Sequence, residues 1–198
     1  MASEQPGMHA ALAAVGELLE HENEECAVVV LGGTALTLQG LVSRVTRDVD
    51  VVAMGEITDG KVTAIIPPDP LPDSLIRAVS RVARDFGLPR DWLNTVVAAQ
   101  WRTGMPDGFE ERLHWRTMGG LHLGLLDRMD LIFFKLFAAA DQAGPQSKHY
   151  QDLIALEPTV AELDAATKWV LLQDASTAFS AIVREVADHA RTDLRRSR

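Results

Sequence analysis

Apolar residues recur at helical spacing over residues 8–20, and this pattern predicts an amphipathic helix. Residues 27–31 form a continuous valine-rich run that ends at two glycines, which predicts a buried strand. A short helix is expected directly afterwards, over residues 34–41. Acids then alternate with valines at residues 48–53 before the pattern turns apolar, which predicts a second strand. The chain therefore begins helix, strand, helix, strand.

Glycines and prolines are frequent over residues 55–73, and we predict a loop there with one strand at residues 62–66. One helical stripe of apolar residues then extends over residues 71–86, with Gly87 as a typical helix end. Asp91 follows, and it predicts an N-cap for a helix that continues to residue 100.

Two strand-like segments, 112–118 and 121–126, flank a glycine pair and predict a hairpin. Helices alone are predicted beyond it: residues 128–142 with Asp127 as cap, 148–156, one opened by the capping-box pattern at Thr159 and Glu162, and 176–190. We therefore expect an α+β fold with a small mixed β-sheet and a helical C-terminal half. The expected domains are residues 1–126, an α/β core, and 127–198, a helical region packed on it.

Charge narrows the classes of function. The 198 residues include 28 acids and 19 bases, a net charge of −9, which disfavours an extended surface for duplex nucleic acid.

The single cysteine, Cys26, cannot form an internal disulfide. The N-terminal segment lacks the pattern of a signal peptide, and the longest apolar run, 131–140, is interrupted by Lys135 and too short for a bilayer. We expect a cytoplasmic protein with no membrane partner.

The glycines that end the first strand are the first candidate for chemistry. Gly32 and Gly33 allow backbone N–H groups to approach an anion at a helix N-terminus, and Thr34 adds a hydroxyl. The sequence is neither a Walker loop nor a dinucleotide-binding fingerprint. An ordinary tight turn with a helix cap is the alternative.

Asp48 and Asp50 are the second candidate. Residues two apart on a strand point to the same face, so their carboxylates repel each other unless a cation lies between them. Mg²⁺ is typically held by one or two carboxylates together with substrate phosphates. A solvent-facing pair on an edge strand is the alternative.

Lys135 stands alone as a polar residue within the apolar segment LIFFKLFAAA. Lysine is almost never fully buried unless it is paired, so its ammonium either reaches the surface or meets an anion in a cleft. The candidate anions are Asp152, Asp48, Asp50 or a ligand phosphate.

Two further groups are charged. Lys148, His149 and Asp152 follow a Gly-Pro break, and the last two share a helical face, as a metal pair would. A polar helix surface is the alternative. Arg44 and Arg47 precede the acid pair and would add positive charge near phosphates, or they are simply exposed.

The order of these features is more specific than any one of them. The segment LGGTALTLQGLVSRVTRDVDVV resembles the nucleotidyltransferase superfamily, in which a strand ends in Gly-Gly or Gly-Ser and the next strand carries Asp-x-Asp or Asp-x-Glu. It is similar to the bacterial branch that contains AbiEii-type toxins. That branch also has Lys-Leu-x-Ala and Lys-x-x-x-Asp-Leu, which match the segments beginning at Lys135 and Lys148. The resemblance covers roughly residues 27–156.

The resemblance implies transfer of a nucleoside monophosphate from an NTP to an acceptor with Mg²⁺ or Mn²⁺. The implied acceptor is RNA, a protein side chain or a small molecule, and an antitoxin is an implied partner. The implied roles are metal binding for Asp48 and Asp50, nucleotide binding for Gly32, Gly33, Thr34, Arg44, Arg47 and Lys148, and catalysis for Asp48, Asp50, Lys135 and Asp152.

The sequence departs from the family pattern in one place that affects chemistry. No acid lies between Glu111 and Asp127, so the hairpin lacks the third carboxylate of many members, and Asp127, Asp130 or Asp152 would have to replace it. His149 stands where toxin-type relatives often have aspartate. Two other functions therefore stay open: a catalytically silent nucleotidyltransferase fold that binds a nucleotide or a protein, and an α+β interaction module.

Overall fold

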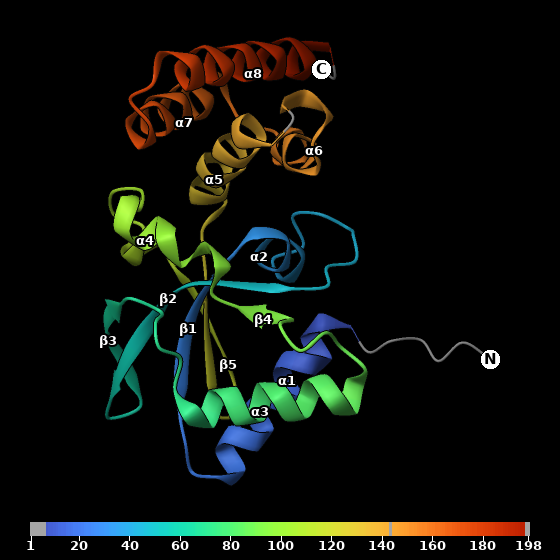
Figure 1. The fold of residues 1–198 in the computed structure, drawn as a ribbon, viewed down its shortest axis with the longest axis vertical. Coiled ribbons are helices and arrows are strands. Elements are labelled where there is room, and N and C mark those ends of the chain that lie inside the picture. Colours follow the sequence, from blue (N-terminus) through green and yellow to red (C-terminus); the bar gives the residue numbers. More distant parts are fainter. Residues whose placement is uncertain (1–6, 143, 197–198) are drawn as a thin grey trace, which may run out of the picture. The chain divides into compact units, whose positions relative to one another are not determined.

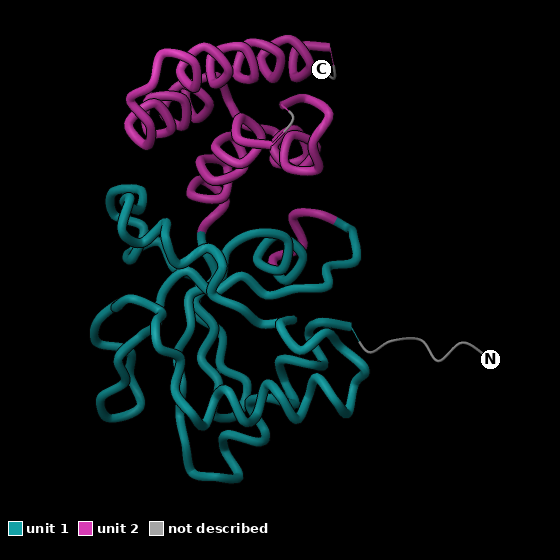
Figure 2. The backbone as a smooth tube through the Cα atoms, in the orientation of Figure 1, with its two compact units in different colours: residues 1–38, 43–126 teal, residues 39–42, 127–198 magenta. Residues whose placement is uncertain are grey.

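The computed structural model describes residues 7–142 and 144–196, which form two compact units (Figure 2). The first comprises residues 1–38 and 43–126, and the second comprises residues 39–42 and 127–198. The ends of the predicted domains, 1–6 and 197–198, lie outside the described residues. No helix in the described ranges is both long enough and apolar enough to cross a bilayer.

The first unit is built on a mixed sheet, which together with the helices confirms the α+β class. The strand order is β3-β2-β1-β6-β5, and β4 also pairs with β2. β1 runs parallel to β6 and β2 runs parallel to β4, whereas the other pairs are antiparallel. The strands are β1 (Cys26–Leu31), β2 (Val49–Thr58), β3 (Lys61–Ile66), β4 (Leu93–Asn94), β5 (His114–Met118) and β6 (Leu121–Leu125).

Two amphipathic helices of this unit, α1 (Met8–His21) and α3 (Asp73–Phe86), lie side by side against the sheet (Figure 1). α1 lies so close to the β5–β6 hairpin that a β-carbon on Gly16 would overlap the carbonyl group of Met118. α3 ends at Gly87, whose φ of 66° is the left-handed conformation expected of this cap. The remaining helices of the unit are α2 (Gly32–Leu38), the short α4 (Ala99–Thr103), and the 3-10 turns η1 (Val96–Ala98) and η2 (Glu110–Arg112).

Two of the sequence predictions for this unit are wrong. Residues 55–58 continue β2 instead of forming a loop, because they pair with β3 around a turn at Gly60. The helix predicted from Asp91 to residue 100 is replaced by β4, η1 and the start of α4. Trp92 explains much of this difference: it is buried and donates its indole N–H to the carbonyl oxygen of Val79 at 3.2 Å, which places the next residues beside β2.

The second unit consists of four helices and a short 3-10 turn, η3 (Gly144–Gln146), within its described residues. α5 carries the apolar segment, and its phenylalanines contact Trp169 of α7 with ring centroids 5.2–6.5 Å apart. Asp127 accepts the backbone N–H of Met129, and Thr159 forms the reciprocal capping box with Glu162, so both predicted caps are confirmed. The helices are α5 (Arg128–Asp141), α6 (Lys148–Ala155), α7 (Val160–Gln173) and α8 (Thr177–Arg196).

Glu162 joins two of these helices and makes the second unit sensitive to acid. Its carboxylate lies 2.6 Å from the guanidinium of Arg128, which holds the pKa of Glu162 below its usual value, and it also accepts the N–H of Thr159. A lowered folded-state pKa stabilises the fold at pH values above about 4.3, and this contribution is lost as the pH falls through the folded-state pKa.

We expect Glu162→Gln to lower the free energy of unfolding by about 1 kcal/mol at pH 7, because it weakens both the ion pair and the cap. The difference between parent and variant should shrink as the pH falls below about 4. Urea unfolding at pH 7 and pH 3.5 measures it. Glu185→Gln, at an exposed position on α8, is the control. An equal loss of stability for Glu162→Gln at both pH values would contradict the assignment.

Candidate functional site

The glycine turn and the acid pair meet because β1 and β2 are antiparallel neighbours. In their register Leu31 is opposite Asp50, so the end of one strand lies beside the start of the other. Gly32 has a φ of +78°, and a β-carbon placed on it would lie 2.7 Å from Oδ2 of Asp50. The carboxylate of Asp50 therefore occupies space that is open only because residue 32 has no side chain. Asp48 is exposed, immediately before β2.

Threonine hydroxyls fasten the segment that leads into Asp48 to α2. The buried Thr34 donates to the carbonyl oxygen of Asp48 at 2.6 Å and also lies 3.2 Å from Oγ1 of Thr46. The hydroxyl of Thr37 donates to the carbonyl oxygen of Gly33 at 3.0 Å and to that of Arg44 at 3.4 Å. Thr34 thus holds the backbone of Asp48 in place.

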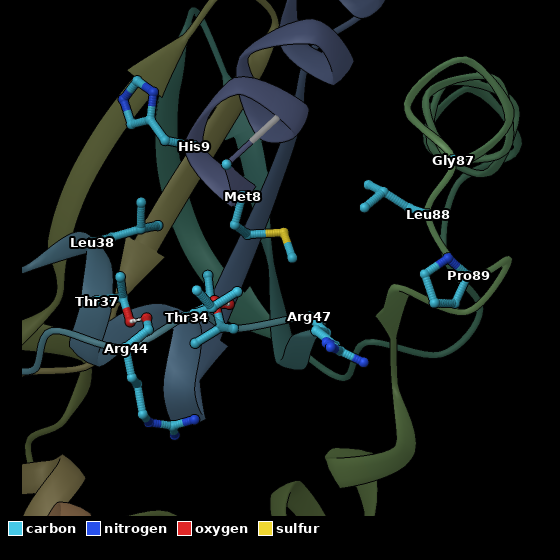
Figure 3. A pocket seen from close by; sticks show the side chains of 13 residues that line it. Met8, His9, Thr34, Thr37, Leu38, Arg44, Arg47, Gly87, Leu88 and Pro89 are labelled. Carbon is cyan, nitrogen blue, oxygen red and sulfur yellow. Dashed lines mark hydrogen bonds between the residues drawn. The ribbon is translucent and has the colours of Figure 1, made fainter. Parts of the chain in front are cut away.

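The two arginines that precede the acid pair take different directions. A β-carbon on Gly33 would lie 2.8 Å from Nη2 of Arg44, so this guanidinium lies beside the glycine turn. Arg47 is exposed, and its side chain extends away from that of Arg44 (Figure 3). Arg44 is therefore the arginine that brings positive charge close to the Gly32–Asp50 contact.

A pocket of about 980 Å³ lies within the first unit, beside α2. It includes Arg44, Arg47 and Thr34 among the predicted residues, but not the two glycines or the two aspartates. Most residues of its wall carry no functional signal in the sequence. Segment 87–89, for example, shows only the pattern of a helix end. The lining residues are Gly7, Met8, His9, Thr34, Thr37, Leu38, Arg44, Val45, Thr46, Arg47, Gly87, Leu88 and Pro89.

In the second unit, Lys135 and Asp152 form an ion pair. Nζ of Lys135 lies 2.7 Å from Oδ2 of Asp152, and the two side chains are only 4% and 5% exposed. Asp152 is one of the anions that the sequence offered for this lysine. Lys148 is exposed at the start of α6, and His149 lies 3.1 Å from Oε1 of Gln142.

The same unit contains a tyrosine held in its neutral form. Tyr150 lies on α6, and its hydroxyl donates to Asp193 of α8 at 2.7 Å. Burial raises the pKa of Tyr150 above its usual value, and the Asp193 carboxylate raises it further. The phenol therefore stays protonated at neutral pH and serves as a hydrogen-bond donor between the two helices.

The chemistry of the acid pair bears on the predicted metal. Asp48 and Asp50 offer carboxylate oxygens, the ligands that Mg²⁺ prefers, and the absence of a side chain on Gly32 leaves room around the second carboxylate. In the part of the chain that the structure describes, no group of three or more His, Cys, Asp or Glu residues could hold a metal ion. Asp127, one replacement for the third acid, accepts the N–H of Met129 at 2.8 Å.

Comparison with known families identifies the family of the chain. A family model described as a nucleotidyltransferase of unknown function (DUF6036) matches residues 10–154. The chain belongs to this nucleotidyltransferase family. The match spans the glycine turn, the acid pair and the Lys135–Asp152 pair, which confirms the superfamily that the sequence motifs resemble. No curated protein and no solved structure matched the chain. Membership of the AbiEii-type branch stays a prediction.

Gly32 of this family member offers a direct test of the contact. Gly32→Ala forces a β-carbon against the Asp50 carboxylate at a positive φ, and we expect a loss of roughly 1–3 kcal/mol in the free energy of unfolding. Gly60→Ala is the matched control, because its φ is +68° and nothing lies within 4 Å of an added β-carbon. Urea unfolding of both variants separates backbone strain from crowding. Equal losses would mean that the Asp50 contact is not tight.

Proposed function

We propose that the protein transfers a nucleoside monophosphate from an NTP to an acceptor, with Mg²⁺ or Mn²⁺ held by Asp48 and Asp50. One observation carries this proposal: the Asp50 carboxylate lies against Gly32 at the beginning of α2. Membership of the nucleotidyltransferase family supports it. The register between β1 and β2 explains why residues 18 positions apart in sequence meet at this point.

The divalent ion would supply positive charge at the phosphate oxygens of the NTP. Asp48 and Asp50 are the two carboxylates that would bind it, and Thr34 holds the backbone of Asp48 by the 2.6 Å hydrogen bond. A fixed backbone limits the reorganisation needed when charge develops on the phosphate.

The glycine turn would receive the phosphates. Gly32 and Gly33 lie at the start of α2, where backbone N–H groups have no partner inside the helix. The guanidinium of Arg44 beside Gly33 adds a permanent positive charge. Backbone N–H groups and an arginine together favour an anion of high charge, such as a triphosphate.

Label transfer tests the reaction and separates it from phosphoryl transfer. We expect label from α-³²P-NTP, but not from γ-³²P-NTP, to enter an acceptor in the presence of Mg²⁺, because the α-phosphoryl group moves and pyrophosphate leaves. Each NTP is incubated with the protein and total cell RNA. Digestion with nuclease or protease then distinguishes an RNA acceptor from a protein acceptor, and chromatography detects a small molecule.

The same assay defines failure. Metal-dependent binding of NTP with no transfer to any acceptor would favour the catalytically silent nucleotidyltransferase fold. Transfer of the γ-label would identify a kinase-like reaction instead. If NTP neither binds with Mg²⁺ nor transfers label, the proposal is wrong.

A further inference from the structure

The pocket beside α2 has a charge opposite to that of the protein as a whole. The chain carries 28 acids against 19 bases, yet none of the described residues that line the pocket is Asp or Glu. Arg44 and Arg47 both line it, and because the guanidinium of Arg44 lies beside Gly33, the charge of Arg47 is the one assigned to the pocket. In an acidic protein such a cavity attracts anions from a surface that otherwise repels them. Its chemistry therefore favours an anionic ligand.

The walls of the pocket also contain a large apolar part. Met8 of α1 and Leu88 after α3 point toward each other across the hollow, Pro89 lies next to Leu88, and Arg47 lies at the lower edge in this view (Figure 3). A bare inorganic anion would leave these apolar surfaces in contact with water. A ligand with one anionic group and one apolar body covers both kinds of wall.

The wall that bears the arginines is formed in advance. Thr34 contacts Thr46, and Thr37 contacts the carbonyl group of Arg44, so segment 44–47 is tied to α2 at two points. A preformed wall lowers the entropic cost of binding. The volume of about 980 Å³ also suits a small organic molecule.

We propose that this pocket binds a small organic phosphate of nucleotide size, at a site separate from the Asp48–Asp50 pair. Arg47 contacts the phosphate, and the apolar body lies against Met8, Leu88 and Pro89. The two aspartates and Gly32 are not part of the lining, and binding here needs no divalent ion. The site does not depend on the proposed reaction, because its evidence is the shape and charge of the pocket.

Calorimetric titration with AMP in the presence of EDTA tests the site without a metal-dependent contribution. We expect saturable binding that Arg47→Gln weakens at least tenfold. Arg90→Gln, which removes a nearby exposed arginine outside the lining, should change the affinity less than twofold. Leu88→Glu brings a carboxylate to the apolar wall and should also weaken binding at least tenfold, with circular dichroism to verify the fold.

Two further probes test the class of ligand. Adenosine and inorganic phosphate should each bind at least tenfold more weakly than AMP, because each satisfies only one kind of wall. Equal affinity for adenosine or for phosphate would overturn the class, and absence of saturable AMP binding at millimolar concentration would overturn the site. A tenfold loss in Asp50→Asn would place AMP at the carboxylates and also overturn it. Label transfer is measured separately, so either proposal can fail alone.

Discussion

Replacing Lys135 by Met should lower the free energy of unfolding by roughly 3–5 kcal/mol, because it removes the ammonium from a buried carboxylate. The two charged groups are 2.7 Å apart, and each side chain is at most 5% exposed. Urea unfolding measures the change. Lys148→Met is the control, because Lys148 is exposed at the first residue of α6 and its loss should cost less than about 1 kcal/mol.

A double variant separates the charge from the packing. Lys135→Met with Asp152→Leu replaces the buried pair by apolar side chains, and we expect it to recover most of the lost stability. If Lys135→Met has the same free energy of unfolding as the parent, the Lys135–Asp152 pair is solvated in solution and the prediction is wrong. That result would favour the alternative in which Lys135 lies beside ligand phosphates. The label-transfer assay on the stable double variant then tests the catalytic role that the motif implies.

Asp50→Asn should reduce metal-dependent NTP binding roughly tenfold or more, because an amide cannot replace a charged oxygen ligand of Mg²⁺. Label transfer should fall by about two orders of magnitude. The shape of the side chain is unchanged, so the unfolding midpoint should be close to that of the parent. Titration with each NTP, with Mg²⁺ and with EDTA, measures the difference.

The matched control is Asp59→Asn in the turn between β2 and β3. Asp59 has a φ of 52°, a conformation that asparagine tolerates well, so the substitution removes one charge at little structural cost. It should leave metal-dependent binding unchanged. If both variants lose affinity equally, the effect reflects the overall charge and the metal role of Asp50 is wrong.

Local patterns in the sequence predicted most elements because their causes are local. The capping box at Thr159, the αL glycine at residue 87 and the hairpin around Gly119 depend on residues within a few positions of each other. Two predictions failed for different reasons. Residues 55–58 belong to a local hairpin with β3, which the frequent glycines and prolines of the segment concealed. Trp92 is buried and hydrogen-bonded to Val79, 13 residues earlier, a contact that a local pattern does not contain.

The candidate site shows the same division. The sequence by itself determined which residues carry charge, the strand-glycine-helix turn, the Asp-x-Asp spacing and the superfamily, since these depend on order along the chain. Only the tertiary structure decided that the Asp50 carboxylate lies against Gly32 and that Lys135 pairs with Asp152. Strand register and helix packing set these contacts, and both depend on surfaces that distant segments bury together. The pocket beside α2 follows from the same cause, because segments from four parts of the described chain form its wall.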